Sequence, residues 1–98
     1  MKKRIRELLK EGKKFESLYF NLYVNKREDL KIGFIVNSKI GNPVKRNKAK
    51  RIIREIIRKN FKKGDFLFLL KKEAIETEKE NIENFFENIK NEISAIFN

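Results

Sequence analysis

A basic amphipathic stretch between Asn42 and Gly64 constrains this chain more strongly than its other features. Asn42 can cap the N-terminus of a helix, and Pro43 then stands at the first helical position, where a missing N–H costs nothing. Gly64 is a natural left-handed stop just beyond the run, so the pattern predicts a helix over residues 43–62. One side of this helix is apolar and must pack on another element. That side comprises Ala49, Ile52, Ile53, Ile56 and Ile57.

The flank of the predicted helix is strongly basic. Four of its side chains stack one turn apart and two more lie beside them: Arg46, Lys50, Arg54 and Arg58, with Asn47 and Arg51. Such a column of like charges opposes helix formation unless a polyanion screens it. Arginine binds phosphate oxygens with a forked pair of N–H groups, and the free N–H groups of the first helical turn also favour anions. A merely solvated face is the alternative, but solvated faces usually mix signs and Glu55 is the only acid here.

The net charge points to the same kind of partner. The 98 residues carry a formal charge of +11, which suggests nucleic acid or an anionic membrane surface. Residues 73–98 differ, because they hold two lysines and seven glutamates, so we expect the polyanion to meet the chain elsewhere. Four of these acids have a spacing that could suggest a cation site, although a solvated face is the simpler interpretation. They are Glu76, Glu80, Glu83 and Glu87.

Several classes of function are excluded by what the chain lacks. Cysteine and histidine are absent, which excludes disulfides, thiol nucleophiles, imidazole bases and the usual zinc sites. The scattered carboxylates and the isolated Gly41 form neither an acid–base pair nor a phosphate loop, so the side chains alone predict no catalyst. We find no signal peptide and no run of about 18 apolar residues. We therefore expect a single cytoplasmic domain, residues 1–98, with no membrane partner.

The N-terminal third predicts one helix and one strand. A helix over residues 3–11 ends at Gly12, and alternation with period two begins at Leu18 and runs to Asn25. The inward set is Leu18, Phe20, Leu22 and Val24, and the outward set includes Tyr19, Asn21 and Tyr23. Outward aromatic side chains either stack on unpaired bases beside a basic surface, which favours single-stranded RNA over duplex DNA, or pack beneath a helix.

The remaining chain completes an α+β domain of order α-β-β-α-β-α. Residues 25–29 are predicted to form a hairpin to a second strand over 31–37, in which Ile35 is an apolar residue on the outer side. The apolar run 65–70 predicts a strand covered on both faces. Thr77–Glu80 has the spacing of a capping box that opens a final helix.

The string K-x-G-N-x-V-x-R-N-x-x-K-R-x-x-R-E, from Lys39 to Glu55, resembles the signature of the protein component of bacterial ribonuclease P. Gly12, the run Phe20–Tyr23 and Gly64–Asp65 extend the resemblance over nearly the whole chain. It implies a two-layer sandwich with a small mixed sheet and a left-handed strand–helix–strand crossover. It also implies an accessory subunit of an endonuclease whose catalytic component is RNA. That RNA removes the 5′ leader from precursor tRNA, and the protein binds the leader and raises the affinity for substrate and metal.

The resemblance also implies partners and site residues. The partners are the catalytic ribonuclease P RNA and precursor tRNA, with no DNA, and Mg²⁺ is held mainly by RNA and substrate instead of by protein side chains. The expected RNA-binding residues are Lys39, Arg46, Asn47, Lys48, Lys50, Arg51, Arg54 and Arg58. The expected leader-binding cleft comprises Ile5, Leu9, Tyr19, Asn21 and Tyr23, and the family usually has aromatic residues where Ile5 and Leu9 stand. The alternative is a ribosomal or other structural RNA-binding protein without a role in tRNA processing.

Overall fold

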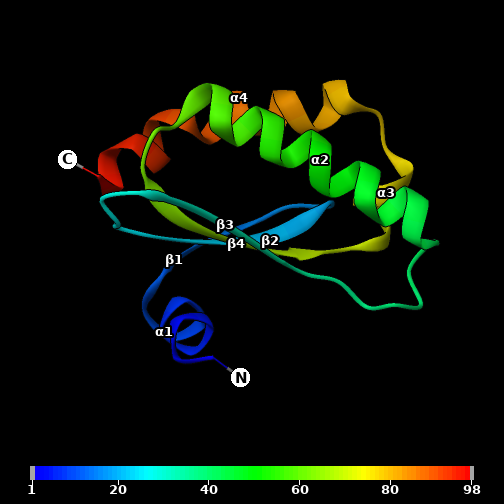
Figure 1. Cartoon of the computed structure of the whole chain (residues 1–98). Helices are drawn as coiled ribbons and strands as arrows, with labels where there is room; N and C mark the ends of the chain where they lie inside the picture. The colour runs from blue at the N-terminus through cyan, green and yellow to red at the C-terminus, as the bar shows by residue number, and fades with distance from the viewer. Residues whose placement is uncertain (1, 98) are drawn as a thin grey trace.

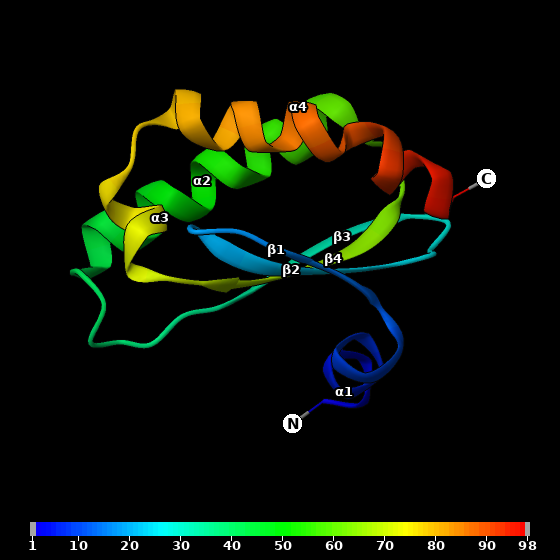
Figure 2. The same cartoon turned by 180° about the vertical axis from the view of Figure 1, so that it is seen from behind.

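The computed structural model describes residues 2–97 and is built around a mixed sheet of four strands. In chain order the elements are α1 (Lys3–Glu11), β1 (Lys13–Glu16), β2 (Phe20–Asn25), β3 (Leu30–Ile35), α2 (Pro43–Asn60), β4 (Gly64–Leu70), α3 (Lys72–Glu76) and α4 (Lys79–Ile96). The strand order is β1-β2-β4-β3, and β4 is antiparallel to β2 and parallel to β3. Figures 1 and 2 show α2, α3 and α4 over one face of the sheet and α1 on the opposite face. The predicted α+β sandwich is confirmed.

The β3–α2–β4 unit is the crossover of this fold. β3 and β4 are parallel neighbours, and α2 runs back across the sheet between them. In Figure 1 both strands run toward the right below α2, with β3 nearer the viewer than β4, and Figure 2 shows the same arrangement from behind. The crossover is therefore left-handed, as the resemblance implied and against the general right-handed preference.

The hairpin predicted over residues 25–29 is wrong. β2 and β3 are not neighbours, because β4 lies between them. The hairpin of this sheet joins β2 to β1, a strand that was not predicted. The Ser17 hydroxyl shapes its turn, since it accepts hydrogen bonds from the N–H groups of Tyr19 and Phe20 and donates one to the Phe20 carbonyl. β2 therefore begins at Phe20, Leu18 is 66% exposed, and the predicted alternation is wrong for residues 18 and 19.

α2 begins as predicted and ends slightly earlier. The Asn42 Oδ1 atom accepts a hydrogen bond from the Lys45 N–H at 2.9 Å, which confirms the cap. The helix ends at Asn60 instead of residue 62. Gly64 is not its left-handed stop: it has a φ of +120° and is the first residue of β4.

Two features of the C-terminal segment differ from the prediction. The short helix α3 was not predicted, and it ends at the position where the capping box was expected. The Thr77 hydroxyl accepts a hydrogen bond from the Asn81 amide, while α4 begins at Lys79 without a side-chain cap. The apolar side of α4 packs inward as predicted, and its outer glutamates are exposed.

The two faces of the sheet are covered unequally. The main core lies between the sheet and the helices α2 and α4, and its fully buried side chains include Phe20, Leu22, Ile53, Ile57, Phe66, Phe68 and Ile93. The opposite face, which we call the α1 face, is covered in part by α1. Leu8 of α1 and Leu67 of β4 are buried there, outside the main core. This unequal covering leaves sheet residues accessible beside α1.

Candidate RNA-binding site

Two rows of side chains cross all four strands on the α1 face. Residues that pair directly on neighbouring strands project to the same face of a sheet. The first row comprises Lys14, Tyr23, Leu67 and Gly33. The second row comprises Glu16, Asn21, Leu69 and Ile35. Ile35 is 39% exposed and Leu69 is the one residue of β4 that is not buried, so the second row is the more open of the two.

Tyr23 lies on the α1 face as predicted, beside a fixed cation. The Lys14 ammonium stands 5.8 Å from the centroid of the Tyr23 ring. Lys14 also forms an ion pair with the Glu16 carboxylate at 2.7 Å. This hydrogen-bonded contact raises the pKa of Lys14 and lowers the pKa of Glu16. Both groups are therefore charged at neutral pH, and Lys14 is a candidate site residue that the sequence did not indicate.

The other predicted leader residues lie in three places. Asn21 shares the α1 face with Tyr23, and its Oδ1 atom is buried with no hydrogen-bond partner in the part of the chain that the structure describes. Ile5 and Leu9 are half-buried on α1. Tyr19 precedes β2 and packs against the main core, so its predicted place on the same face as Tyr23 is wrong.

The basic column of α2 lies along β3, an edge strand of the sheet. The Arg46 Nη1 atom donates hydrogen bonds to three carbonyl oxygens of the loop 38–41, at 2.8, 3.1 and 3.4 Å. Arg54 lies one helical turn beyond Lys50, and its guanidinium stands 5.1 Å from the centroid of the Phe34 ring in β3. Two arginines of the column are thus held in place by neutral groups. Their charge is not neutralised by an acid in these contacts, and it stays available to a phosphate.

The remaining predicted RNA-binding residues complete this column or lie beside it. Three of them are exposed on the outer side of α2: Asn47, Arg51 and Arg58. Lys39 is exposed in the loop that Arg46 holds, and its N–H donates to the Asn37 side chain at 2.9 Å. Lys48 lies on the flank of α2 that faces α3, where it lines a groove with Ile75, and Arg51 borders the same groove. Lys48 therefore lies away from the side of α2 that faces β3.

The two predicted surfaces meet at β3. Phe34 packs against the main core beneath Arg54, whereas the next residue, Ile35, projects to the α1 face. The basic column and the open row of the α1 face thus adjoin a single edge strand. Such a surface can bind phosphates through fixed cations and bases through an aromatic ring.

The described residues contain neither a candidate metal site nor a candidate membrane span. Within residues 2–97, no three acidic side chains gather in a way that could hold a metal ion. No helix in this range is long and apolar enough to cross a membrane.

A family model described as Ribonuclease P matches residues 1–94. The chain belongs to the ribonuclease P family. This family member is 33% identical to the ribonuclease P protein component of Bacillus velezensis over 90 residues, which cover 82% of this chain and 78% of that relative. It is 46% identical to the component of Finegoldia magna over 57 residues, which cover 57% of this chain and 50% of the relative. The match to the ribonuclease P protein component of Nitratiruptor covers 60% of that relative. The chain thus spans about half the length of these first curated relatives.

Solved structures of ribonuclease P proteins share the whole fold. The protein from Staphylococcus aureus superposes with a TM-score of 0.74 at 26% identity, and the match covers 100% of this chain and 96% of that chain. The protein from Thermotoga maritima also gives a TM-score of 0.74, at 27% identity, with 93% and 92% covered. The left-handed α+β architecture is therefore that of ribonuclease P proteins.

Proposed function

We propose that this chain is the RNA-binding subunit of ribonuclease P and assists a catalytic RNA in removing the 5′ leader from precursor tRNA by endonucleolytic cleavage. In this proposal the protein binds the leader and raises the affinity for substrate and for Mg²⁺, which the RNA and the substrate hold. The observation that carries the proposal is the meeting of the basic column and the open row of the α1 face at β3. Family membership favours this function over that of a ribosomal or other structural RNA-binding protein.

The basic column is the proposed contact to the catalytic RNA. Arg46 and Arg54 are held by carbonyl oxygens and by the Phe34 ring, so binding a phosphate costs them less side-chain entropy than a free arginine would lose. Lys50 stands between them, and Arg51 and Arg58 extend the charge along the exposed side of α2. Such contacts bind the backbone of an RNA and carry no base specificity.

The α1 face is the proposed contact to the leader. A leader base can stack on the Tyr23 ring while the neighbouring phosphate approaches the Lys14 ammonium. Ile35 and Leu69 add apolar surface in the adjoining row. This assignment keeps Asn21 and Tyr23 from the predicted leader residues and leaves out Tyr19, which the main core holds.

Reconstitution with the cognate RNA tests the function. We expect the purified protein alone to leave precursor tRNA intact, because its side chains form no catalytic set. Added to the RNA, it is expected to stimulate cleavage at physiological Mg²⁺ concentration. Robust cleavage by protein that is free of RNA, or an RNA whose cleavage does not respond to the protein, would contradict the proposal.

A Tyr23→Ala variant tests the leader contact. Stacking of a base on an aromatic side chain contributes about 1–3 kcal/mol, so precursor tRNA should bind up to about a hundredfold more weakly while mature tRNA is unaffected. Tyr23→Phe keeps the ring and should lose much less. Tyr19→Ala is the matched control, since it should lower stability without changing the ratio of the two affinities. Equal losses for both tRNAs in Tyr23→Ala would make Tyr23 a structural residue.

A further inference from the structure

α1 is held on the sheet by little apolar contact. Of its nine residues only Leu8 is buried, while Ile5 and Leu9 stay half-exposed. The longer helix α2, on the opposite face of the sheet, has four buried residues. A helix as short as α1 is not stable alone in water, so its position depends on tertiary contacts. One buried leucine leaves its orientation weakly determined.

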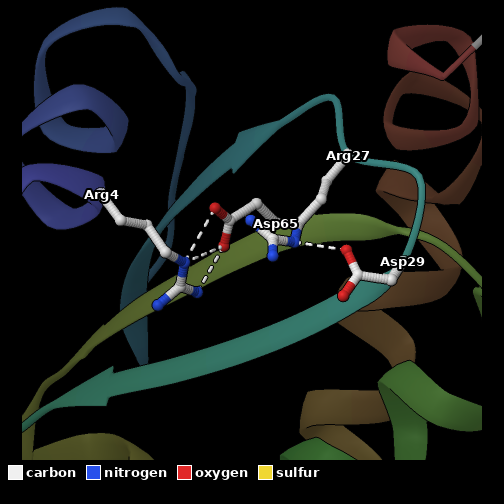
Figure 3. A network of polar contacts seen from close by, with 4 residues as sticks. All are labelled: Arg4, Arg27, Asp29 and Asp65. Carbon is white, nitrogen blue, oxygen red and sulfur yellow. Dashed lines mark hydrogen bonds and ion pairs between the residues drawn. The ribbon is translucent and has the colours of Figure 1, made fainter.

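A forked ion pair supplies the missing constraint (Figure 3). The Arg4 Nε atom donates to both carboxylate oxygens of Asp65, each at 2.9 Å, and Arg4 Nη2 also donates to Oδ1. Asp65 is 6% exposed, and among residues 2–97 it is the one charged residue that is buried. The Arg4 side chain is 31% exposed. Forked contacts of this kind determine orientation as well as distance. The pair joins the first turn of α1 to the first residues of β4, a central strand.

Gly33 of β3 leaves space for this contact. A Cβ atom at residue 33 would stand 3.8 Å from each Nη atom of Arg4 and 3.5 Å from Leu67 Cδ1. These are ordinary van der Waals distances, so the guanidinium already fills the space into which a larger side chain would project. The Arg4 guanidinium thus lies next to Gly33 of β3 while it binds Asp65 on the neighbouring strand β4.

We propose that the Arg4–Asp65 pair positions α1 on the sheet and thereby sets the shape of the leader-binding surface beside it. The inference rests on the proposed leader contact. Arg4 and Asp65 are positioning residues, which act through α1 and its half-exposed Ile5 and Leu9. When the pair is broken, α1 leaves the sheet for part of the time while the main core, on the other face, stays folded. The apparent affinity for the leader then falls in proportion to the docked fraction.

An Arg4→Gln variant tests the inference with two measurements. Hydrogen exchange of the full chain should show lost protection of the α1 amides and retained protection in β2 and β4. In the particle reconstituted with the cognate RNA, a docked fraction of about one tenth would weaken precursor binding about tenfold and leave mature tRNA binding unchanged. Arg4→Lys keeps a point charge near Asp65 without the fork, so it should restore part of both properties.

Two variants that remove one arginine each serve as controls. Arg6→Gln removes a charge from the exposed side of α1. Arg27→Gln removes the arginine of the exposed Arg27–Asp29 pair, whose atoms are 2.5 Å apart within one loop (Figure 3). Neither should change α1 protection or the precursor-to-mature ratio.

Three results would overturn the inference. The first is full α1 protection in Arg4→Gln, and the second is an equal loss of precursor affinity in Arg6→Gln, which would make the effect one of charge alone. The third is lost α1 protection with an unchanged precursor-to-mature ratio. In that case Tyr23→Ala, measured in the same titration, separates the two ideas: a loss there retains the leader surface and removes only the positioning role of the pair.

Discussion

Two arginines of α2, Arg46 and Arg51, are expected to respond differently to the same substitution. Both belong to the proposed RNA-binding surface, and Ala at either position removes one positive charge. Arg51 is exposed, whereas Arg46 also donates hydrogen bonds to three carbonyl oxygens in the loop 38–41. Arg46→Ala therefore removes a proposed phosphate contact and a structural contact together, and Arg51→Ala removes only the proposed phosphate contact.

The phosphate contribution is measured through salt. Each lost contact should reduce the slope of log affinity against log salt by about 0.7–0.9. The loss of affinity between about 50 and about 200 mM salt should then be about threefold smaller than for the unaltered protein. This change should be the same for Arg46→Ala and Arg51→Ala.

The structural contribution is measured by thermal unfolding. Hydrogen bonds to a charged donor contribute about 1.5–3 kcal/mol when buried, but this loop is largely exposed, so we take about 1 kcal/mol for the three bonds of Arg46 together. In a domain of this size 1 kcal/mol corresponds to about 4–8 °C in Tm. Arg46→Ala should lose that much, and Arg51→Ala should lose almost none.

Arg46→Lys separates the two contributions. Lysine keeps the charge but lacks the planar fork, so the salt slope should be retained while most of the Tm loss remains. Equal Tm values for Arg46→Ala and Arg51→Ala would refute the role of the carbonyl contacts. Unchanged salt slopes in both variants, with the fold intact, would refute the phosphate contacts.

Three further predictions concern the fold and the α1 face. Leu22→Ala, in the main core, should lower the free energy of unfolding by about 2–5 kcal/mol, whereas Leu18→Ala at the exposed turn should change it by less than about 0.5 kcal/mol; urea denaturation compares them. Gly64→Ala should lower the free energy of unfolding by more than about 1–3 kcal/mol, the cost of backbone strain at its φ of +120°. The added Cβ would also stand 2.3 Å from a ring carbon of Phe97, the residue that caps α4, and thermal unfolding measures the combined loss. The hydrogen bond from Lys14 lowers the pKa of Glu16, so the ion pair is complete above the ordinary glutamate pKa and is lost only as pH falls through the lowered pKa. An NMR titration of Glu16 should therefore show no change between about pH 5 and about pH 8.

Features that depend on neighbours in the sequence were predictable. The cap at Asn42 and the apolar side around Ile53 both follow from spacing within one helix, and both are confirmed. Strand partners do not follow from such spacing. Alternation over residues 20–25 tells which side chains share a face, but not which strand lies alongside, so the insertion of β4 between β2 and β3 was missed. β1 has a single buried residue, Phe15, which is too little for a period to be recognised.

The candidate site was predictable to the same extent. Helical spacing identified the basic column, but the contacts that hold Arg46 depend on where the loop after β3 runs. The alternation of its strand placed Ile35 on the outer side, and its exposure on the α1 face is consistent with the apolar surface proposed beside the leader contact. The pair of Arg4 with Asp65 joins residues 61 positions apart, so no local pattern could indicate it.

The position of β4 has a consequence for how the molecule is made. It is the last strand along the chain and yet occupies a central place in the sheet. During synthesis β2 and β3 emerge first, and neither has its main partner until the ribosome has passed Leu70. α2 is complete at Asn60, but Phe66 and Phe68, on which its apolar side rests, are added later. Closing of the sheet and seating of the basic helix are therefore one late, cooperative event, and a nascent chain that stops before β4 has the charge to attract RNA but no surface that can orient it.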